Sequence, residues 1–190
     1  IGTYPDAGIY STAFYSLEKG KRKLRNVLIN EHIHFLVHDY FKESVMNGLS
    51  ICWTSSLCLK KEVIKEIPMF RVGIKRGEDL DLWLRIALNY DVAYLNLPKV
   101  FYRTGLSDSL TSDYSKNGEF PYYEWFNFTS ESSYYRKYVI LAMYIHAKNA
   151  FIHHDYDTCL AEVWSVKTIA WRFKWAERLL LLVISWIKSK

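Results

Sequence analysis

A short amphipathic segment lies between two strand-like segments, and this arrangement restricts the chain to a layered α/β fold. From Glu78 the sequence reads EDLDLWLRIAL. Its apolar residues recur at the three- and four-residue spacing of a helix, at Leu80, Trp83, Leu84, Ala87 and Leu88. Runs with strand composition precede it at 49–59 and follow it at 92–97. A helix with one apolar face between two strands buries that face against a sheet, so the sequence predicts the α/β class.

Other short elements are expected on both sides of this helix. The predicted elements are, in chain order, a strand at 7–15, a basic loop at 18–23, a loosely periodic helix at 24–41, a short helix stopped by Pro68 and a strand at 99–104. Polar residues 54–56 interrupt the strand-like run over 49–59. Residues 105–118 are rich in Ser, Asp and Gly, which is typical of a long loop.

The character of the sequence changes near Pro121. Residues 132–154 are predicted to form one helix. A second helix is expected to begin at Asp157, whose carboxylate suits an N-cap, and to end at about Ile187. We therefore expect an α/β part at 1–120, followed by a C-terminal helical extension at 121–190 that forms a helical hairpin.

Composition narrows the class of protein further. Half of the 190 residues are hydrophobic and 17% are aromatic, which disfavours a disordered chain. The longest apolar run, 179–187, is far shorter than the roughly 20 residues that span a bilayer. The net charge of +5 suits a nucleotide, a phospholipid surface or a nucleic acid, and equally suits a solvated surface with extra lysines. Three cysteines at no metal-binding spacing predict free thiols in a reducing compartment.

Two acidic residues, Glu78 and Asp79, open the predicted helix. A helix N-terminus carries about half a positive charge and several unpaired N–H groups, so it stabilises an ionised carboxylate in the first turn. An ionised carboxylate can take a proton from a hydroxyl as a general base. Position alone favours the ordinary alternative, in which both acids only stabilise the start of the helix.

The residues around this helix form an ordered set of motifs. A strand containing TSS, at 54–56, is followed by a short helix, an aromatic residue, a loop and the Glu-Asp pair of EDLDLWLR. A hydrophobic strand comes next, and then a Tyr-Arg strand that leads into a Ser-containing loop. From Ile51 to about Thr111 this set resembles the C-terminal half of the catalytic domain of family 2 glycosyltransferases, which are inverting enzymes with a GT-A fold. PDAGIYSTAF, at 5–14, is similar to the strand that follows the nucleotide-binding half of that domain.

The resemblance implies that residues 1–120 are the acceptor-side half of a GT-A, nucleotide-diphospho-sugar transferase domain. Asp79 would be the catalytic base, which deprotonates an acceptor hydroxyl as it attacks the anomeric carbon of a nucleotide-sugar. The implied acceptor-side residues are Glu78, Trp83 and Arg85. The implied donor-side residues are Thr54, Ser55, Ser56, Tyr102 and Arg103. For Trp83, helical spacing favours a place in the core over stacking on a sugar.

Two features depart from the family pattern. DLD at 79–81 matches the D-x-D that holds a divalent metal in such enzymes, but residues two apart on a helix point about 200° apart. We therefore assign no metal ligand here, and expect the complete enzyme to bind Mg or Mn through a D-x-D outside this chain. Gly105 stands where many relatives carry a histidine. Because these residues include no nucleotide-binding half, we do not expect them to catalyse transfer alone.

Histidine and cysteine patterns offer weaker candidates. His32, His34 and His38 lie in the predicted helix at 24–41, and the last two have the i, i+4 spacing of a zinc-binding pair. We favour surface histidines, because no third ligand is evident nearby. Cys52 and Cys58 are predicted to be small buried residues.

The last predicted helix carries a stripe of large apolar residues at Trp164, Trp171, Trp175, Leu182 and Trp186. One interpretation is that the stripe packs against the preceding helix. The other is that residues 157–190 lie in a membrane interface, with basic residues on the opposite side of the helix facing anionic lipid. Nucleic-acid binding is disfavoured, because the basic residues of this helix are dispersed and accompany no recognised motif.

The sequence leads to one principal hypothesis and two alternatives. The principal hypothesis is a cytoplasmic, membrane-associated glycosyltransferase that moves a sugar from a nucleotide-sugar to the hydroxyl of a sugar or lipid-linked acceptor in surface polysaccharide synthesis. The first alternative is a non-catalytic module whose helical hairpin docks a partner. The second is a membrane-surface module that uses the tryptophan-rich helix.

Overall fold

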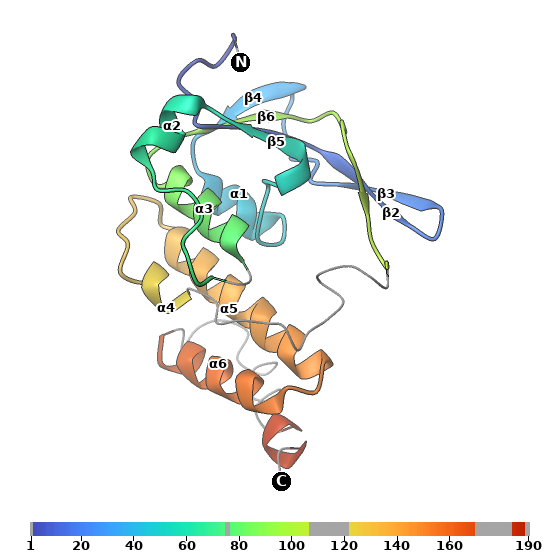
Figure 1. The fold of residues 1–190 in the computed structure, drawn as a ribbon, viewed down its shortest axis with the longest axis vertical. Coiled ribbons are helices and arrows are strands. Elements are labelled where there is room, and N and C mark those ends of the chain that lie inside the picture. The colour runs from blue at the N-terminus through green and yellow to red at the C-terminus, as the bar shows by residue number, and fades with distance from the viewer. Residues whose placement is uncertain (1, 75–76, 107–121, 170–183, 189–190) are drawn as a thin grey trace.

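The chain forms a mixed α/β structure, as the sequence predicts (Figure 1). The computed structural model describes residues 2–74, 77–106, 122–169 and 184–188. The larger sheet has the strand order β4-β6-β1-β5. Strand β1 (Ile9–Thr12) runs parallel to β6 (Val92–Leu95) and antiparallel to β5 (Leu57–Leu59), and β4 (His34–Val37) runs antiparallel to β6. Helices α1, α3 and α5 lie on one side of this sheet (Figure 1).

A single large core joins the sheet to these helices. Helix α1 spans Tyr40–Met46, α3 spans Glu78–Ala87 and α5 spans Tyr135–Ile152. Alternate strand residues such as Ile9 and Tyr94 point into this core, which also contains Leu84 of α3 and Met143 of α5. The first half of α5 therefore packs with the α/β part of the chain.

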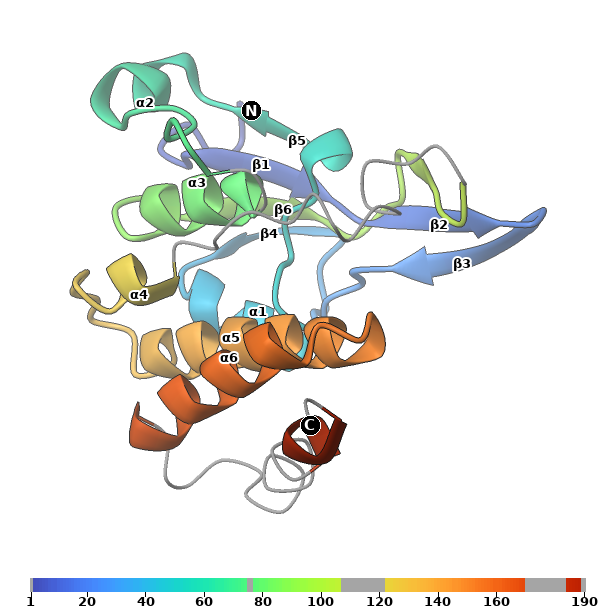
Figure 2. The ribbon, with the colours of Figure 1, turned by 60° about the horizontal axis from the view of Figure 1, so that its bottom comes forward.

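Helix α6 (Tyr156–Ile169) packs on the second half of α5 (Figure 2). Small residues make this contact, namely Ala147 and Ala150 on α5 with Cys159 and Val163 on α6. Ala150 and Cys159 are completely buried, so the two backbones approach closely. The predicted hairpin of two C-terminal helices is present over these residues.

A second, three-stranded sheet extends from the first, with the order β3-β2-β7. Strand β2 spans Phe14–Glu18, β3 spans Lys21–Arg25 and β7 spans Phe101–Arg103. The turn between β2 and β3 contains Lys19 at φ +47° and Gly20 at φ +78°. Two consecutive left-handed residues form the type I′ turn that matches the twist of a hairpin. Figure 2 shows this hairpin projecting away from the helices.

The predicted helix at 24–41 is wrong. Its first residues belong to β3, and residues 34–37 form β4, where Phe35 and Val37 are buried and their neighbours are more exposed. This alternation has the period of a strand, which outweighs the loose helical spacing. Helix α1 begins only after Asp39, whose Oδ1 accepts the Lys42 N–H at 3.0 Å. Of the predicted basic loop at 18–23, only Lys19 and Gly20 form a turn, because Glu18 ends β2 and residues 21–23 belong to β3.

Several element boundaries can be compared with the prediction. Helix α2 (Lys61–Glu66) ends before Pro68, and α3 starts at Glu78, as predicted. Within the predicted strand at 49–59, only β5 is extended in a sheet, because residues 54–56 form a 3₁₀ turn (η1, Thr54–Ser56). Asp157 is not the N-cap of α6, since Asp155 accepts the Thr158 N–H instead, at 3.2 Å. The predicted boundary near residue 121 lies outside the described residues, and α4 (Tyr122–Trp125) follows it.

Candidate active site at the start of α3

Helix α3 starts directly after a glycine whose backbone conformation is rare for other residues. Gly77 has a φ of +74°, and its carbonyl oxygen accepts the Asp81 N–H at 2.9 Å. Glu78 and Asp79 are the first two helical residues, and both are half-buried. The predicted base therefore lies in the first turn of α3, beside the N–H groups that the helix itself leaves unpaired.

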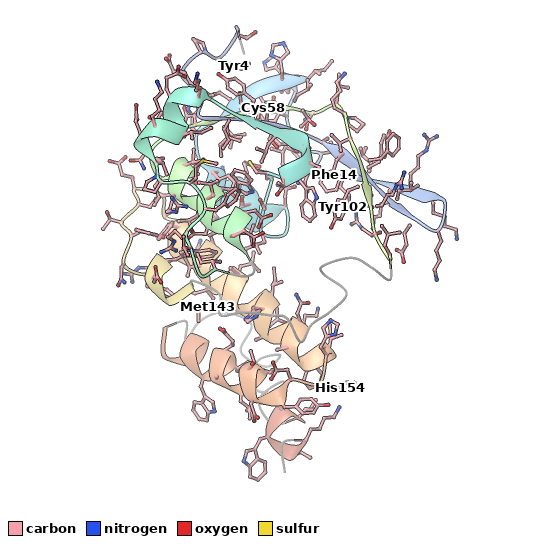
Figure 3. The ribbon with its side chains drawn as sticks, in the orientation of Figure 1. Tyr4, Phe14, Cys58, Tyr102, Met143 and His154 are labelled. Atoms are coloured by element: carbon pink, nitrogen blue, oxygen red, sulfur yellow. The ribbon has the colours of Figure 1, made fainter. Side chains whose placement is uncertain are left out.

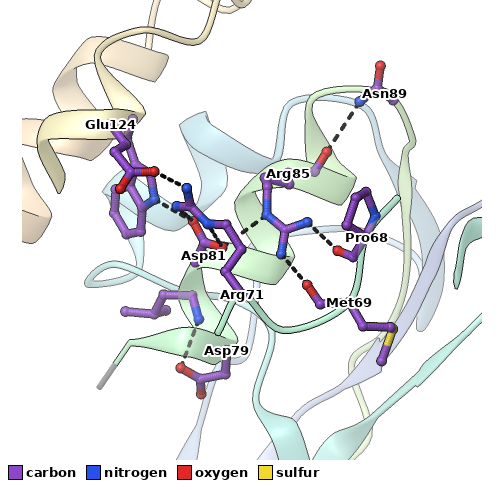
Figure 4. A network of polar contacts seen from close by, with 10 residues as sticks. Pro68, Met69, Arg71, Asp79, Asp81, Arg85, Asn89 and Glu124 are labelled. Atoms are coloured by element: carbon purple, nitrogen blue, oxygen red, sulfur yellow. Dashed lines mark hydrogen bonds and ion pairs between the residues drawn. The ribbon is translucent and has the colours of Figure 1, made fainter. Parts of the chain in front are cut away.

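Two neutral donors hold the Asp79 carboxylate. Its Oδ2 accepts a hydrogen bond from the Thr54 hydroxyl at 3.0 Å. Its Oδ1 accepts the Leu80 N–H at 2.8 Å, which is the dashed line drawn at Asp79 in Figure 4. Within the described ranges of the chain, Asp79 forms no ion pair. A carboxylate has about four acceptor positions, so this one retains capacity to accept a hydroxyl proton.

Asp81, two residues further along α3, has a different environment. Its side chain is completely buried and accepts hydrogen bonds from two arginines and a tryptophan (Figure 4). The Nε atoms of Arg71 and Arg85 each lie 2.9 Å from Oδ2, and Nε1 of Trp125 lies 2.8 Å from Oδ1. A second nitrogen of Arg71 also bonds Oδ1. Both carboxylate oxygens of Asp81 are therefore occupied by hydrogen bonds from protein side chains.

The partners of Asp81 connect α3 to its surroundings. Arg71 also pairs with Glu124 on α4, and Arg85 donates to the Pro68 and Met69 carbonyl oxygens, the latter at 2.7 Å. Partial burial lowers the pKa of Arg71, but its hydrogen bonds and the negative charges around it outweigh this and raise the pKa above the ordinary value. The network therefore fastens the segment after α2, helix α3 and helix α4 together.

Tyr135 on α5 extends the same network. Its hydroxyl donates to the carbonyl oxygen of Trp125 at 2.6 Å. Burial, and then the negative charge of Asp81, raise the pKa of the Tyr135 phenol above its usual value. The neutral phenol is the form that this site favours, because both causes disfavour a second negative charge near Asp81.

The geometry of the DLD sequence does not suit a shared metal ion. Asp79 faces Thr54, whereas both oxygens of Asp81 are already bonded to Arg71, Arg85 and Trp125. The two carboxylates have different partners, as expected for residues two apart on a helix.

The three predicted donor-side residues in η1 are not together. Thr54 bonds Asp79, whereas Ser55 and Ser56 line a separate hollow of about 450 Å³ with Tyr10 and Cys58 of the larger sheet. Ser56 is buried, and its hydroxyl donates to the Trp53 carbonyl oxygen at 3.1 Å. Only Thr54 of this trio therefore contacts the candidate base.

An aromatic group anchors the segment that carries Thr54. Trp53 stacks on Phe14 with ring centroids 5.1 Å apart, and its ring meets Tyr102 edge-on at 5.0 Å. Figure 3 shows Phe14 and Tyr102 next to each other at the junction of the two sheets. Arg103 is exposed and points to the opposite face of β7, because successive strand residues alternate. Tyr102 is therefore linked to the candidate site through Trp53, and Arg103 is not.

Two of the predicted acceptor-side residues do not face the site. The Trp83 ring is only 2% exposed and belongs to the core, which is the alternative that its helical spacing favours. Arg85 is bound to Asp81 and to backbone carbonyl oxygens on the other side of α3. Glu78 remains next to Asp79 in the first turn.

The histidines and cysteines that the sequence analysis considered do not gather into one cluster. His34 contacts Tyr4, and His38 pairs with Asp91 at 2.7 Å, so the helical spacing that suggested a zinc pair does not exist. Cys52 is buried, which raises its pKa to about 12. Cys58 is exposed, contrary to the prediction, because it lies on the open face of β5.

The tryptophan stripe can be assessed only in part. Trp164 and Trp186 are 52% and 54% exposed. Trp171, Trp175 and Leu182 lie outside the described residues. No helix in the described part of the chain is both long enough and apolar enough to cross a membrane.

One ion pair of this site has a signal in the sequence, and the other contacts have none. Asp81 and Arg85 have the i, i+4 spacing of a helical ion pair, which is a local signal. Trp125 is 44 residues away from Asp81, and no local pattern connects them. Trp53 precedes the TSS motif directly, but its stacking on Phe14 depends on how the two sheets meet.

Comparison of the chain with models of known protein families gives no match, and comparison with curated proteins gives none either. The function is therefore inferred from the residues of the site itself.

Proposed function

We propose that this chain carries the acceptor side of an inverting glycosyltransferase with a GT-A fold, and that Asp79 is its general base. The observation that carries the proposal is the difference between the two aspartates of α3. Asp81 is saturated by cationic and indole donors, whereas Asp79 is held by two neutral donors and has acceptor capacity to spare. The order of motifs from Ile51 to about Thr111 supports the same class of enzyme.

In the proposed reaction, Asp79 accepts the proton of an acceptor hydroxyl while that oxygen bonds to the anomeric carbon of a nucleotide-sugar. The bond from this carbon to the diphosphate oxygen breaks on the opposite face, and the electron pair leaves with the nucleoside diphosphate. Attack from one face and departure from the other invert the configuration.

The surroundings of Asp79 support a positioning role for its neighbours. Thr54 and the Leu80 N–H fix the rotation of the carboxylate, and the stacked Trp53 and Phe14 rings hold the backbone that carries Thr54. A base held in one orientation contributes more to catalysis than one that rotates freely.

The complete transferase is expected to use Mg or Mn, but the described residues at this site do not fit such an ion. Both oxygens of Asp81 already accept protein donors, so the DLD sequence offers Asp79 alone. We assign no step to a metal. The exposed rings of Trp164 and Trp186 support the further proposal that the acceptor is presented at the cytoplasmic surface of a membrane.

Transfer can be tested with the full-length protein, a panel of nucleotide-sugars and a lipid-linked glycan acceptor, by measuring release of the nucleoside diphosphate. Asp79→Asn keeps the size of the side chain but not its basicity, so turnover should fall by about 10²–10⁴-fold. Asp6→Asn makes the same change at an exposed aspartate near the other end of α3, and should keep the parent turnover.

Circular dichroism of both variants would verify that they fold. Equal turnover of Asp79→Asn and the parent would exclude Asp79 as the base. A parent protein that binds vesicles but transfers no sugar would instead favour the non-catalytic membrane-surface alternative.

A further inference from the structure

The pairing of the smaller sheet sorts its side chains into two faces. Residues opposite one another in a sheet point to the same side. On one side, the register places two cross-strand rows next to each other, Leu24–Tyr15–Phe101 and Arg22–Leu17–Arg103. We call these six residues the outer face. One row is entirely apolar, and the other has an arginine at each end.

The inner face of the same sheet is occupied by the candidate active site. Phe14 is 4% exposed and stacks on Trp53, and Tyr102 packs edge-on against both rings. Arg25 on this face donates from Nε to the Ser16 hydroxyl at 3.1 Å. The apolar residues of the inner face therefore already have partners within the protein.

The outer face is open to solvent. Phe101 is 57% exposed and Leu24 is 46% exposed, which is unusual for neighbouring large apolar residues. The Tyr15 and Phe101 rings stack with centroids 5.4 Å apart, and the Arg22 guanidinium lies 5.9 Å from the Tyr15 ring centroid. These contacts keep the rings together as one apolar surface and place a cation at its border.

Positive charge is concentrated in the β2–β3 hairpin that carries part of this face. Every residue of β3 is exposed, and Lys21, Arg22, Lys23 and Arg25 lie on that strand. With Lys19 in the turn, the hairpin carries five basic residues and one acid, Glu18, whose side chain belongs to the inner face. The hairpin alone accounts for most of the chain's net charge of +5. None of the six residues of the outer face is acidic.

We propose that the outer face of the β3-β2-β7 sheet binds the surface of an anionic phospholipid bilayer. The Leu24–Tyr15–Phe101 row enters the headgroup region, where aromatic side chains are favoured. Arg22 and Arg103 bond lipid phosphates, which match the fork of a guanidinium. The lysines of the hairpin add long-range attraction to the negative surface.

A phospholipid surface fits these residues better than single-stranded RNA does. RNA platforms use aromatic rings on which bases stack. Here Leu24 and Leu17 occupy two of the four non-arginine positions of the face, and an aliphatic side chain has no ring on which a base can stack. This surface is distinct from residues 157–190, and the inference does not depend on Asp79.

The outer face can be tested by flotation of the full-length protein with vesicles. The vesicles are pure phosphatidylcholine, or phosphatidylcholine mixed with anionic phosphatidylglycerol. We expect binding only to the mixed vesicles, with a loss at high salt. The double variant Arg22→Gln/Arg103→Gln should lower the partition coefficient about ten-fold or more. Phe101→Ser should lower it as well, without any change in charge.

A matched control variant separates the contribution of the outer face to vesicle binding from that of the hairpin's charge alone. Lys21→Gln/Lys23→Gln removes the same charge from the same hairpin but from the inner side of β3, and should lose clearly less binding. Equal losses in the two double variants would overturn the proposal, and so would unchanged binding of Arg22→Gln/Arg103→Gln. Binding of a mixed-sequence single-stranded RNA with no binding to mixed vesicles would also overturn it.

Discussion

Two aspartates in the first turn of α3, Asp79 and Asp81, have opposite surroundings. Asp79 lies at the start of the helix and is half-buried, and its hydrogen-bond donors among the described residues are a threonine hydroxyl and a backbone N–H. Asp81 is completely buried and binds Arg71, Arg85 and Trp125. The difference teaches that the neighbours a carboxylate receives, and not its helix or its chemical type, decide whether its oxygens are saturated by the protein or keep acceptor capacity for another group.

The largest expected effect is the loss of stability on removing Asp81. Asp81→Ala leaves Arg85 and part of Arg71 without their buried counter-charge, so the free energy of unfolding should fall by about 3–5 kcal/mol. Unfolding in urea, monitored by circular dichroism, measures this change in the free energy of unfolding. A loss below about 1 kcal/mol would show that the network does not hold the fold together.

A smaller loss is expected at Trp125, which donates to the same carboxylate. Trp125→Phe keeps a buried ring but removes the Nε1–H that lies 2.8 Å from Asp81 Oδ1. A hydrogen bond to a charged group contributes about 1.5–3 kcal/mol, and the free energy of unfolding should fall by that amount. A double-mutant cycle with Asp81→Ala provides the control, because the two changes remove one shared bond. Strict additivity would contradict a direct contribution of this bond.

The smallest change in stability is expected at Asp79. Asp79→Ala removes one favourable charge at a helix N-terminus and one hydrogen bond from Thr54. The free energy of unfolding should therefore fall by about 1 kcal/mol or less. The comparison with Asp81→Ala is matched, since the substitution and the helix are the same. Equal destabilisation by the two variants would remove the distinction between a structural and a chemical aspartate.

The two faces of the smaller sheet repeat this lesson at larger scale. Phe14 and Tyr102 pack against Trp53, whereas their chain neighbours Tyr15 and Phe101 lie on the outer face, where Phe101 is 57% exposed. The sequence Phe14-Tyr15 contains two similar aromatic residues, and nothing in its composition indicates which one faces the site. The strand register decides it, because a shift by one residue exchanges the two faces.

Local signals accounted for the elements that proved predictable. The spacing from Leu80 to Leu88, the glycine at position 77 and Pro68 after α2 all act within a few residues, and α2 and α3 form where these signals place them. The wrong prediction of a helix at 24–41 also had a local cause, because a loose three-to-four spacing concealed the strand period of Phe35 and Val37.

By itself, the sequence determined the α/β class, the position of α3 and the presence of an acid in its first turn, because periodicity, helix ends and breakers are properties of neighbouring residues. Only the tertiary structure decided that Asp81 is the partner of Arg71 and Trp125 and that Thr54 meets Asp79. These contacts join residues 10 to 44 positions apart. Their formation depends on how the sheet and helices pack, and no short pattern along the chain encodes that packing.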